Sequence, residues 1–195
     1  MYISTKHKFA FIHIPKTGGT SIKKALYEFT DKDQIKFDDE KVTDLNGYKP
    51  HIGINKSLYE KYLKYFKFVI VRNPWAWHAS IYKFHKKRNT HPVMKTFKSF
   101  KEYVNALDNK SIEYHKPQVD YFMNDSNSYV DYIGKFESLQ SDFNIIVENI
   151  GIPKIELPHF KNQGIYDYKK MYDNESIDII SKVCEKDIKM FNYKW

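Results

Sequence analysis

Lys16 and the glycine pair behind it are the residues whose types and spacing best suit chemistry on an anion. They lie in FAFIHIPKTGGTSIKKAL, residues 9–26, between an apolar run and a helical pattern. Gly18-Gly19 permits a tight turn, and Thr20 and Ser21 stand at the predicted helix start, where hydroxyl groups favour capping. Such a turn points backbone N–H groups at one place, and Lys16 adds a full positive charge. The pattern predicts an anion-binding loop.

Arg72 is the centre of a second candidate anion site. It ends the apolar run in KFVIVRNPWAWHASIYKF, residues 67–84, and ligands bind at the carboxyl ends of strands in open α/β sheets. Asn73 and Pro74 predict a helix start, with Asn as the cap and Pro at the first helical position. Ser80 lies about two turns into that helix, so its hydroxyl can face back toward Arg72. A guanidinium and a hydroxyl in this arrangement predict a phosphate clamp.

Together the two motifs resemble those of sulfotransferases that use 3′-phosphoadenosine-5′-phosphosulfate (PAPS). PKTGGTS, residues 15–21, is similar to their 5′-phosphosulfate loop, and R-N-P-x5-S-x-Y, residues 72–82, resembles their 3′-phosphate motif. Many heparan 2-O-sulfotransferase-like and carbohydrate relatives carry a further Arg before the Ser, where this chain has Trp77 and His78. IGKFESLQSDF, residues 133–143, and DIKMFNY, residues 187–193, also resemble stretches of the family.

The resemblance implies in-line transfer of a sulfuryl group from PAPS to a hydroxyl, with 3′-phosphoadenosine-5′-phosphate (PAP) as product and no metal. Lys16 would stabilise the leaving phosphate. The residues implied to bind the donor are Pro15, Lys16, Thr17, Gly18, Gly19, Thr20, Ser21, Arg72 and Ser80. A carbohydrate is the expected acceptor, since the basic chain also carries aromatic residues that suit sugars: Trp75, Trp77, Tyr114 and Tyr121. Nucleic acid is not an expected partner.

Transfer to a hydroxyl needs a base, and histidine is the default side chain for this near neutral pH. His51, in KPHIGI between the two anion motifs, is the first candidate, and similar enzymes carry a base histidine at a comparable place. His115 is the alternative base and, with Gln118, a candidate acceptor contact. Glu113 or Asp120 could act as a carboxylate base instead.

Three further side chains have simpler expected roles. His13 precedes the loop within the apolar run, which indicates a hydrogen-bonded core residue. His78 lies near Ser80 and could contact the nucleotide. Cys184 excludes an intrachain disulfide, because it is the one cysteine, and it shares an apolar helical face with Ile177, Ile180 and Ile188. No pattern such as HExxH indicates a metal site.

Two alternative functions fit parts of the sequence. A P-loop kinase or nucleotide hydrolase also needs a glycine-rich phosphate loop, but its lysine follows the glycines, whereas Lys16 precedes them. A nonenzymatic anion or nucleic-acid binder would use the net charge of +8. That second reading leaves the Lys16 and Arg72 motifs unexplained and predicts strong salt dependence.

Strands alternate with helices along the chain, which predicts an α/β fold: a three-layer sandwich with a central parallel sheet, P-loop-NTPase-like, in one domain over 1–195. Strands are predicted at 9–14, 68–71 and 129–133, and helices at 22–29, 99–107 and 139–150. No 18-residue apolar span and no signal-peptide core is present. We therefore expect a cytoplasmic protein of bacterial or viral type.

Overall fold

The computed structural model describes residues 1–30, 53–88, 92–109, 117–124, 127–158 and 167–195, and His51 and His115 lie outside these ranges. The chain divides into two compact units. Unit 1 contains Met1–Val71 and Asp120–Lys161, and unit 2 contains Arg72–Val119 and Asn162–Trp195. One domain over 1–195 stays a prediction.

Unit 1 is built on a four-stranded sheet with the order β1-β2-β3-β6. The strands are β1 (Tyr2–Ser4), β2 (Phe9–Ile12), β3 (Phe66–Val71) and β6 (Tyr132–Lys135). β2, β3 and β6 run parallel, and β1 pairs antiparallel with β2. The α/β fold with a central, mostly parallel sheet is therefore confirmed. The antiparallel edge strand β1 was not predicted, because three residues carry no readable pattern.

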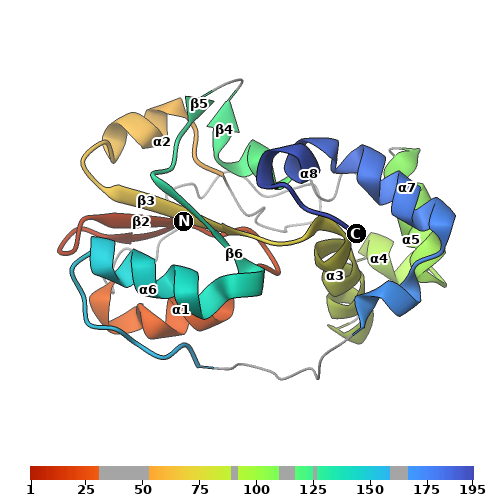
Figure 1. Cartoon of the computed structure of the whole chain (residues 1–195), viewed down its shortest axis with the longest axis horizontal. Coiled ribbons are helices and arrows are strands. Elements are labelled where there is room, and N and C mark those ends of the chain that lie inside the picture. The colour runs from red at the N-terminus through yellow and green to blue at the C-terminus, as the bar shows by residue number, and fades with distance from the viewer. Residues whose placement is uncertain (31–52, 89–91, 110–116, 125–126, 159–166) are drawn as a thin grey trace. The chain divides into compact units, whose positions relative to one another are not determined.

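Helices cover both faces of this sheet (Figure 1). They are α1 (Gly19–Ala25), α2 (Lys56–Lys61) and α6 (Leu139–Asn149), with 3-10 turns η1 (Tyr27–Phe29) and η4 (Phe136–Ser138) and a small hairpin, β4 (Met123–Asn124) and β5 (Asn127–Ser128). Apolar residues of α1 and α6 pack on one face, against Phe9, Phe11, Phe68 and Ile70. Tyr62, at the end of α2, packs on the other face with Ala10.

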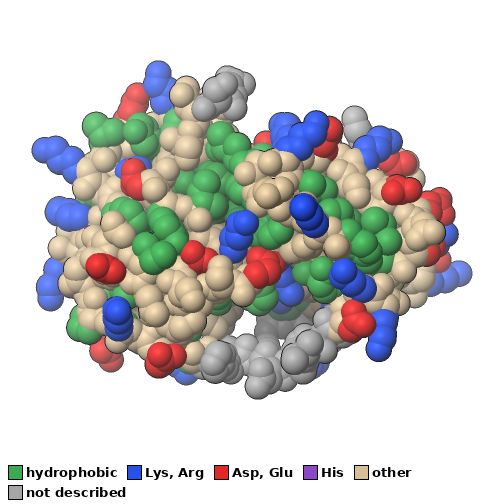
Figure 2. Space-filling model, in the orientation of Figure 1, with side chains coloured by type: hydrophobic (Ala, Val, Ile, Leu, Met, Phe, Trp, Pro, Cys, Tyr) green, Lys and Arg blue, Asp and Glu red, His purple; other side chains and the backbone are tan. Residues whose placement is uncertain are grey.

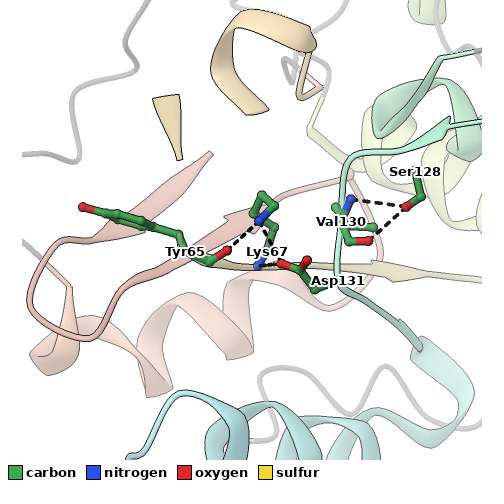
Figure 3. Close-up of polar contacts among 5 residues, drawn as sticks. All are labelled: Tyr65, Lys67, Ser128, Val130 and Asp131. Atoms are coloured by element: carbon green, nitrogen blue, oxygen red, sulfur yellow. Dashed lines mark hydrogen bonds and ion pairs between the residues drawn. The ribbon is translucent and has the colours of Figure 1, made fainter. Parts of the chain in front are cut away.

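A buried lysine fixes the register at the start of β3 (Figure 3). The Lys67 ammonium donates to the Tyr65 carbonyl at 2.6 Å and lies 2.9 Å from the Asp131 carboxylate. Asp131 also accepts from the Lys67 N–H at 2.7 Å and donates its own N–H to the Lys67 carbonyl at 2.8 Å. Ser128 and Val130 close the turn that presents Asp131. Because the Tyr129 N–H donates to the Phe122 carbonyl at 2.9 Å and Val130 is bound in this turn, β6 begins at Tyr132 and not at the predicted 129.

Unit 2 is helical. Its helices are α3 (Pro74–Arg88), α4 (Pro92–Thr96), α5 (Phe100–Asp108), η5 (Tyr168–Met171), α7 (Asn174–Val183) and α8 (Glu185–Phe191), and η3 (Gln118–Tyr121) spans the boundary between the units. The single last helix expected around Cys184 is divided there into α7 and α8. Within the described ranges, no helix is long and apolar enough to cross a bilayer.

Candidate functional site

The loop between β2 and α1 contains a lysine in a strained backbone conformation. Lys16 has φ 64° and Gly18 has φ 85°. The left-handed region costs a residue with a Cβ about 1–2 kcal/mol, and glycine nothing comparable. Such strain collects at functional sites, but Lys8 and Asn192 also have positive φ, of 51° and 53°, outside the two anion motifs. The motif around Lys16, and not its conformation alone, singles it out.

Local bonds hold this loop in place. Thr17 is fully buried, and its Oγ1 donates to the Ile14 carbonyl at 2.9 Å. Gly18 is the N-cap of α1, and the Ser21 N–H donates to the Gly18 carbonyl at 3.0 Å. No side chain caps α1. The expected capping by the Thr20 and Ser21 hydroxyls is therefore wrong, because Gly18 is the N-cap and both residues lie within the first helical turn.

Close packing also disfavours a side chain at either glycine. A Cβ on Gly18 would lie 2.7 Å from Leu139 Cδ2 and 3.2 Å from Phe136 Cδ2, and a Cβ on Gly19 would overlap the His13 imidazole. The loop is therefore seated between the residue after β2 and the start of α6. The IGKFESLQSDF stretch thus meets PKTGGTS in space.

Asp142 joins several residues of the IGKFESLQSDF stretch and its preceding strand by hydrogen bonds. Its carboxylate accepts from the Tyr132 hydroxyl at 2.6 Å, the Lys135 N–H at 2.8 Å and the Ser138 hydroxyl at 2.6 Å. Burial first, and then the bond to Asp142, raises the pKa of Tyr132 to about 12. These bonds fasten α6 to the end of β6, and α6 in turn supports the glycine loop. The role of Asp142 is therefore structural.

Arg72 follows β3 directly, and the next residues begin α3 as predicted. Asn73 Oδ1 accepts from the Trp75 N–H at 3.1 Å and the Ala76 N–H at 3.3 Å, and Pro74 is the first helical residue. Arg72 and Ser80 are both half-buried in unit 2. Whether the hydroxyl of Ser80 and the guanidinium meet on one phosphate stays a prediction.

Gln118 is fully buried, and its carboxamide binds the main chain of Arg72. Oε1 accepts from the Arg72 N–H at 2.8 Å, and Nε2 donates to the Arg72 carbonyl at 2.8 Å. Both ends of the amide are thus used within the protein. This arrangement favours a role in holding Arg72 over the predicted contact with an acceptor.

His78 is buried in the helical unit. Its ring nitrogens lie 2.7 Å from the Tyr103 hydroxyl and 3.3 Å from Cys184 Sγ. Burial lowers the pKa of His78 to about 3, and burial, then the charge of Asp187, raises the pKa of the Cys184 thiol. His78 is therefore a neutral core residue and not a contact to nucleotide, and Cys184 packs in the core as expected.

A model of the sulfotransferase family matches residues 1–194. The chain belongs to the sulfotransferase family. It is 24% identical to human carbohydrate sulfotransferase 9 in an alignment that covers 99% of this chain and 53% of that protein. The chain thus spans about half the length of this curated relative. No solved structure matches it significantly.

The predicted sulfotransferase residues fall into two local groups. Residues 15–21 form the loop before α1 and its first turn in unit 1, and Arg72 and Ser80 both belong to unit 2. His51 and His115 lie outside the described residues. Among the described residues, no group of three or more His, Cys, Asp or Glu could hold a metal.

The expected sugar-stacking aromatics belong to the core. Trp75, Trp77 and Tyr121 are 4%, 0% and 5% exposed, and Tyr114 lies outside the described residues. These rings pack against protein instead of presenting a face to an acceptor. They therefore give no support to a carbohydrate acceptor.

Proposed function

We propose that this sulfotransferase-family chain moves a sulfuryl group from PAPS to a hydroxyl of a carbohydrate. The observation that carries the proposal is the loop between β2 and α1, where Lys16 has φ 64° beside two glycines whose neighbours leave little room for a side chain. An ammonium beside the main-chain N–H groups of a glycine turn suits an anion at this loop.

The residues of the two motifs suit the two ends of such a donor. Residues 15–21 offer the Lys16 ammonium, the Thr20 and Ser21 hydroxyls and main-chain N–H groups for the 5′-phosphosulfate. Arg72 and Ser80 offer a guanidinium and a hydroxyl for the 3′-phosphate. When bound, PAPS supplies an activated sulfuryl group.

In the proposed reaction, the acceptor oxygen bonds to sulfur while the bond from sulfur to the 5′-phosphate oxygen breaks. The phosphate oxygen takes the electron pair, and the Lys16 ammonium offsets that charge. The hydroxyl proton passes to His51 as base, a step that contributes about 10²–10⁴-fold. His115 is the second candidate, and Asp120, which is half-buried, is a carboxylate alternative.

A carbohydrate acceptor is proposed because the human relative is named a carbohydrate sulfotransferase. On the face drawn in Figure 2, Lys and Arg side chains lie among Asp and Glu side chains instead of forming one broad basic surface. On that face, the charge pattern gives no support to a nucleic-acid surface.

The test is transfer of labelled sulfuryl from PAPS to a panel of oligosaccharides, with wild type and Lys16→Ala side by side. Labelled sugar with wild type and none with Lys16→Ala supports the proposal. Labelled sugar at equal rates with both proteins contradicts the role of Lys16. Phosphate transfer from ATP with Mg²⁺, without sulfuryl transfer, would favour a kinase.

A further inference from the structure

The Gln118 side chain makes two hydrogen bonds to the main chain of Arg72, at the N–H and the carbonyl, as the backbone of a paired strand would. Gln118 uses one carboxamide to accept from the Arg72 N–H and to donate to the Arg72 carbonyl. Arg72 is the first residue after β3, so this pair sets the direction in which the chain leaves the strand. Because the guanidinium stands at the end of a long side chain, a small backbone rotation there moves it a long way.

Asp187, a fully buried residue of α8, holds Gln118 in turn. Its Oδ2 accepts from the Gln118 N–H at 2.8 Å and lies 3.4 Å from Gln118 Nε2, and its Oδ1 accepts from the Val119 N–H at 3.0 Å. Bonds to a carboxylate are shorter and stronger than neutral ones. One buried carboxylate thus fixes both the backbone and the amide of Gln118.

The C-terminal segment also binds Asn73, the residue that follows Arg72. Asn73 Nδ2 donates to the Lys194 carbonyl at 3.1 Å, while Asn73 Oδ1 caps α3. Arg72 is therefore bound through its own main chain by Gln118 and through its neighbour by the chain after α8. Each of these contacts lies within unit 2.

We infer that Gln118 and Asp187 are positioning residues that orient Arg72 toward the 3′-phosphate of the donor. The inference rests on the proposed function, because it needs Arg72 to bind that phosphate. It assigns a task to the DIKMFNY stretch, which begins at Asp187 and lies far from the donor motifs in sequence. Neither residue touches the reacting atoms.

The test compares Gln118→Leu and Asp187→Asn with wild type. Gln118→Leu removes both bonds to Arg72 at similar volume, and Asp187→Asn keeps an oxygen for one N–H only. The readout is the ratio of the dissociation constants of AMP and PAP, measured by calorimetry well below each variant's thermal midpoint. We expect both variants to lower this 3′-phosphate preference roughly tenfold, the lower end of the effect that hydrogen-bond partners of metal ligands have on the ligands they orient, with AMP affinity unchanged.

Tyr103→Phe is the matched control. It removes one buried hydrogen bond of the same unit, to His78, without touching Arg72 or its partners. It should lower the thermal midpoint and keep the 3′-phosphate preference.

A wild-type ratio in folded Gln118→Leu, or in Asp187→Asn if the first variant does not fold, overturns the inference. Arg72→Ala separates this outcome from failure of the proposed function. If Arg72→Ala itself keeps the wild-type preference, Arg72 does not bind the 3′-phosphate and the donor assignment is what fails.

Discussion

Replacing Lys16 by glycine separates the need for its charge from the needs of the backbone. Lys16 has φ 64°, where a Cβ costs about 1–2 kcal/mol. Glycine removes that cost but adds about 0.4–1 kcal/mol of unfolded-state entropy relative to alanine. Lys16→Gly should therefore be as stable as Lys16→Ala, or more stable by up to about 1.5 kcal/mol, whereas glycine is the less stable choice at ordinary positions.

The chain contains a matched control for this change. Lys8 has φ 51° in the turn between β1 and β2, and its ammonium lies 5.2 Å from the centre of the Tyr65 ring. Lys8→Gly should relieve the same backbone strain. Relative to wild type, its free energy of unfolding should also fall by roughly 0.5–1 kcal/mol, because the contact with the Tyr65 ring is lost. Sulfuryl transfer should be unaffected there.

The activity of the two Lys16 variants should fall together. Loss of one group that stabilises a developing anion costs about 10²–10³-fold in turnover. The assays are urea unfolding for stability and single-turnover transfer of labelled sulfuryl for activity. Wild-type transfer by Lys16→Gly, or a glycine variant clearly less stable than the alanine variant, would refute the reasoning.

Three further predictions concern histidines. Gly19→Ala should reduce PAP affinity because its methyl overlaps the His13 ring, and adding His13→Ala should restore part of the loss; equal affinities of the single and double variants would exclude this clash. His78 has a pKa of about 3, so below its unfolded value of about 6.5 the unfolded chain binds the extra proton and stability falls as pH falls, by up to about 1.4 kcal/mol per unit. Between pH 7 and 5, the free energy of unfolding measured with urea should fall more steeply in wild type than in His78→Gln. Equal pH dependence in the two proteins would contradict a buried neutral His78. His51→Ala should lower turnover about 10²-fold with PAP affinity preserved, and an unchanged rate would transfer the base role to His115.

The central strands were predictable because strands buried on both faces form continuous apolar runs. Phe9–Ile12 and Phe68–Val71 have this composition, and both are strands. The start of α3 was also predictable, because it depends on adjacent residues: Asn73 accepts from the Trp75 N–H and Pro74 takes the first helical position. The start of β6 was not, because the turn before it is held by contacts distant in sequence, among them Asp131 with Lys67 across 64 positions of the chain.

The candidate site divides in the same way. The glycine loop and the Arg72 segment are short motifs whose chemistry lies within a few residues. The partners that hold Arg72 are 46 positions away at Gln118 and a further 69 at Asp187, so no local pattern connects them. Trp75 and Trp77 show the reverse error: their type suits sugars, but their exposure depends on packing.

Calorimetric titration of the wild-type chain with PAP, with AMP and with ATP plus Mg²⁺ tests the central claim most directly. The account predicts micromolar binding of PAP, at least tenfold weaker binding of AMP, and no gain from Mg²⁺ with ATP. Absence of PAP binding, or a preference for ATP with Mg²⁺, would contradict a PAPS-dependent sulfotransferase.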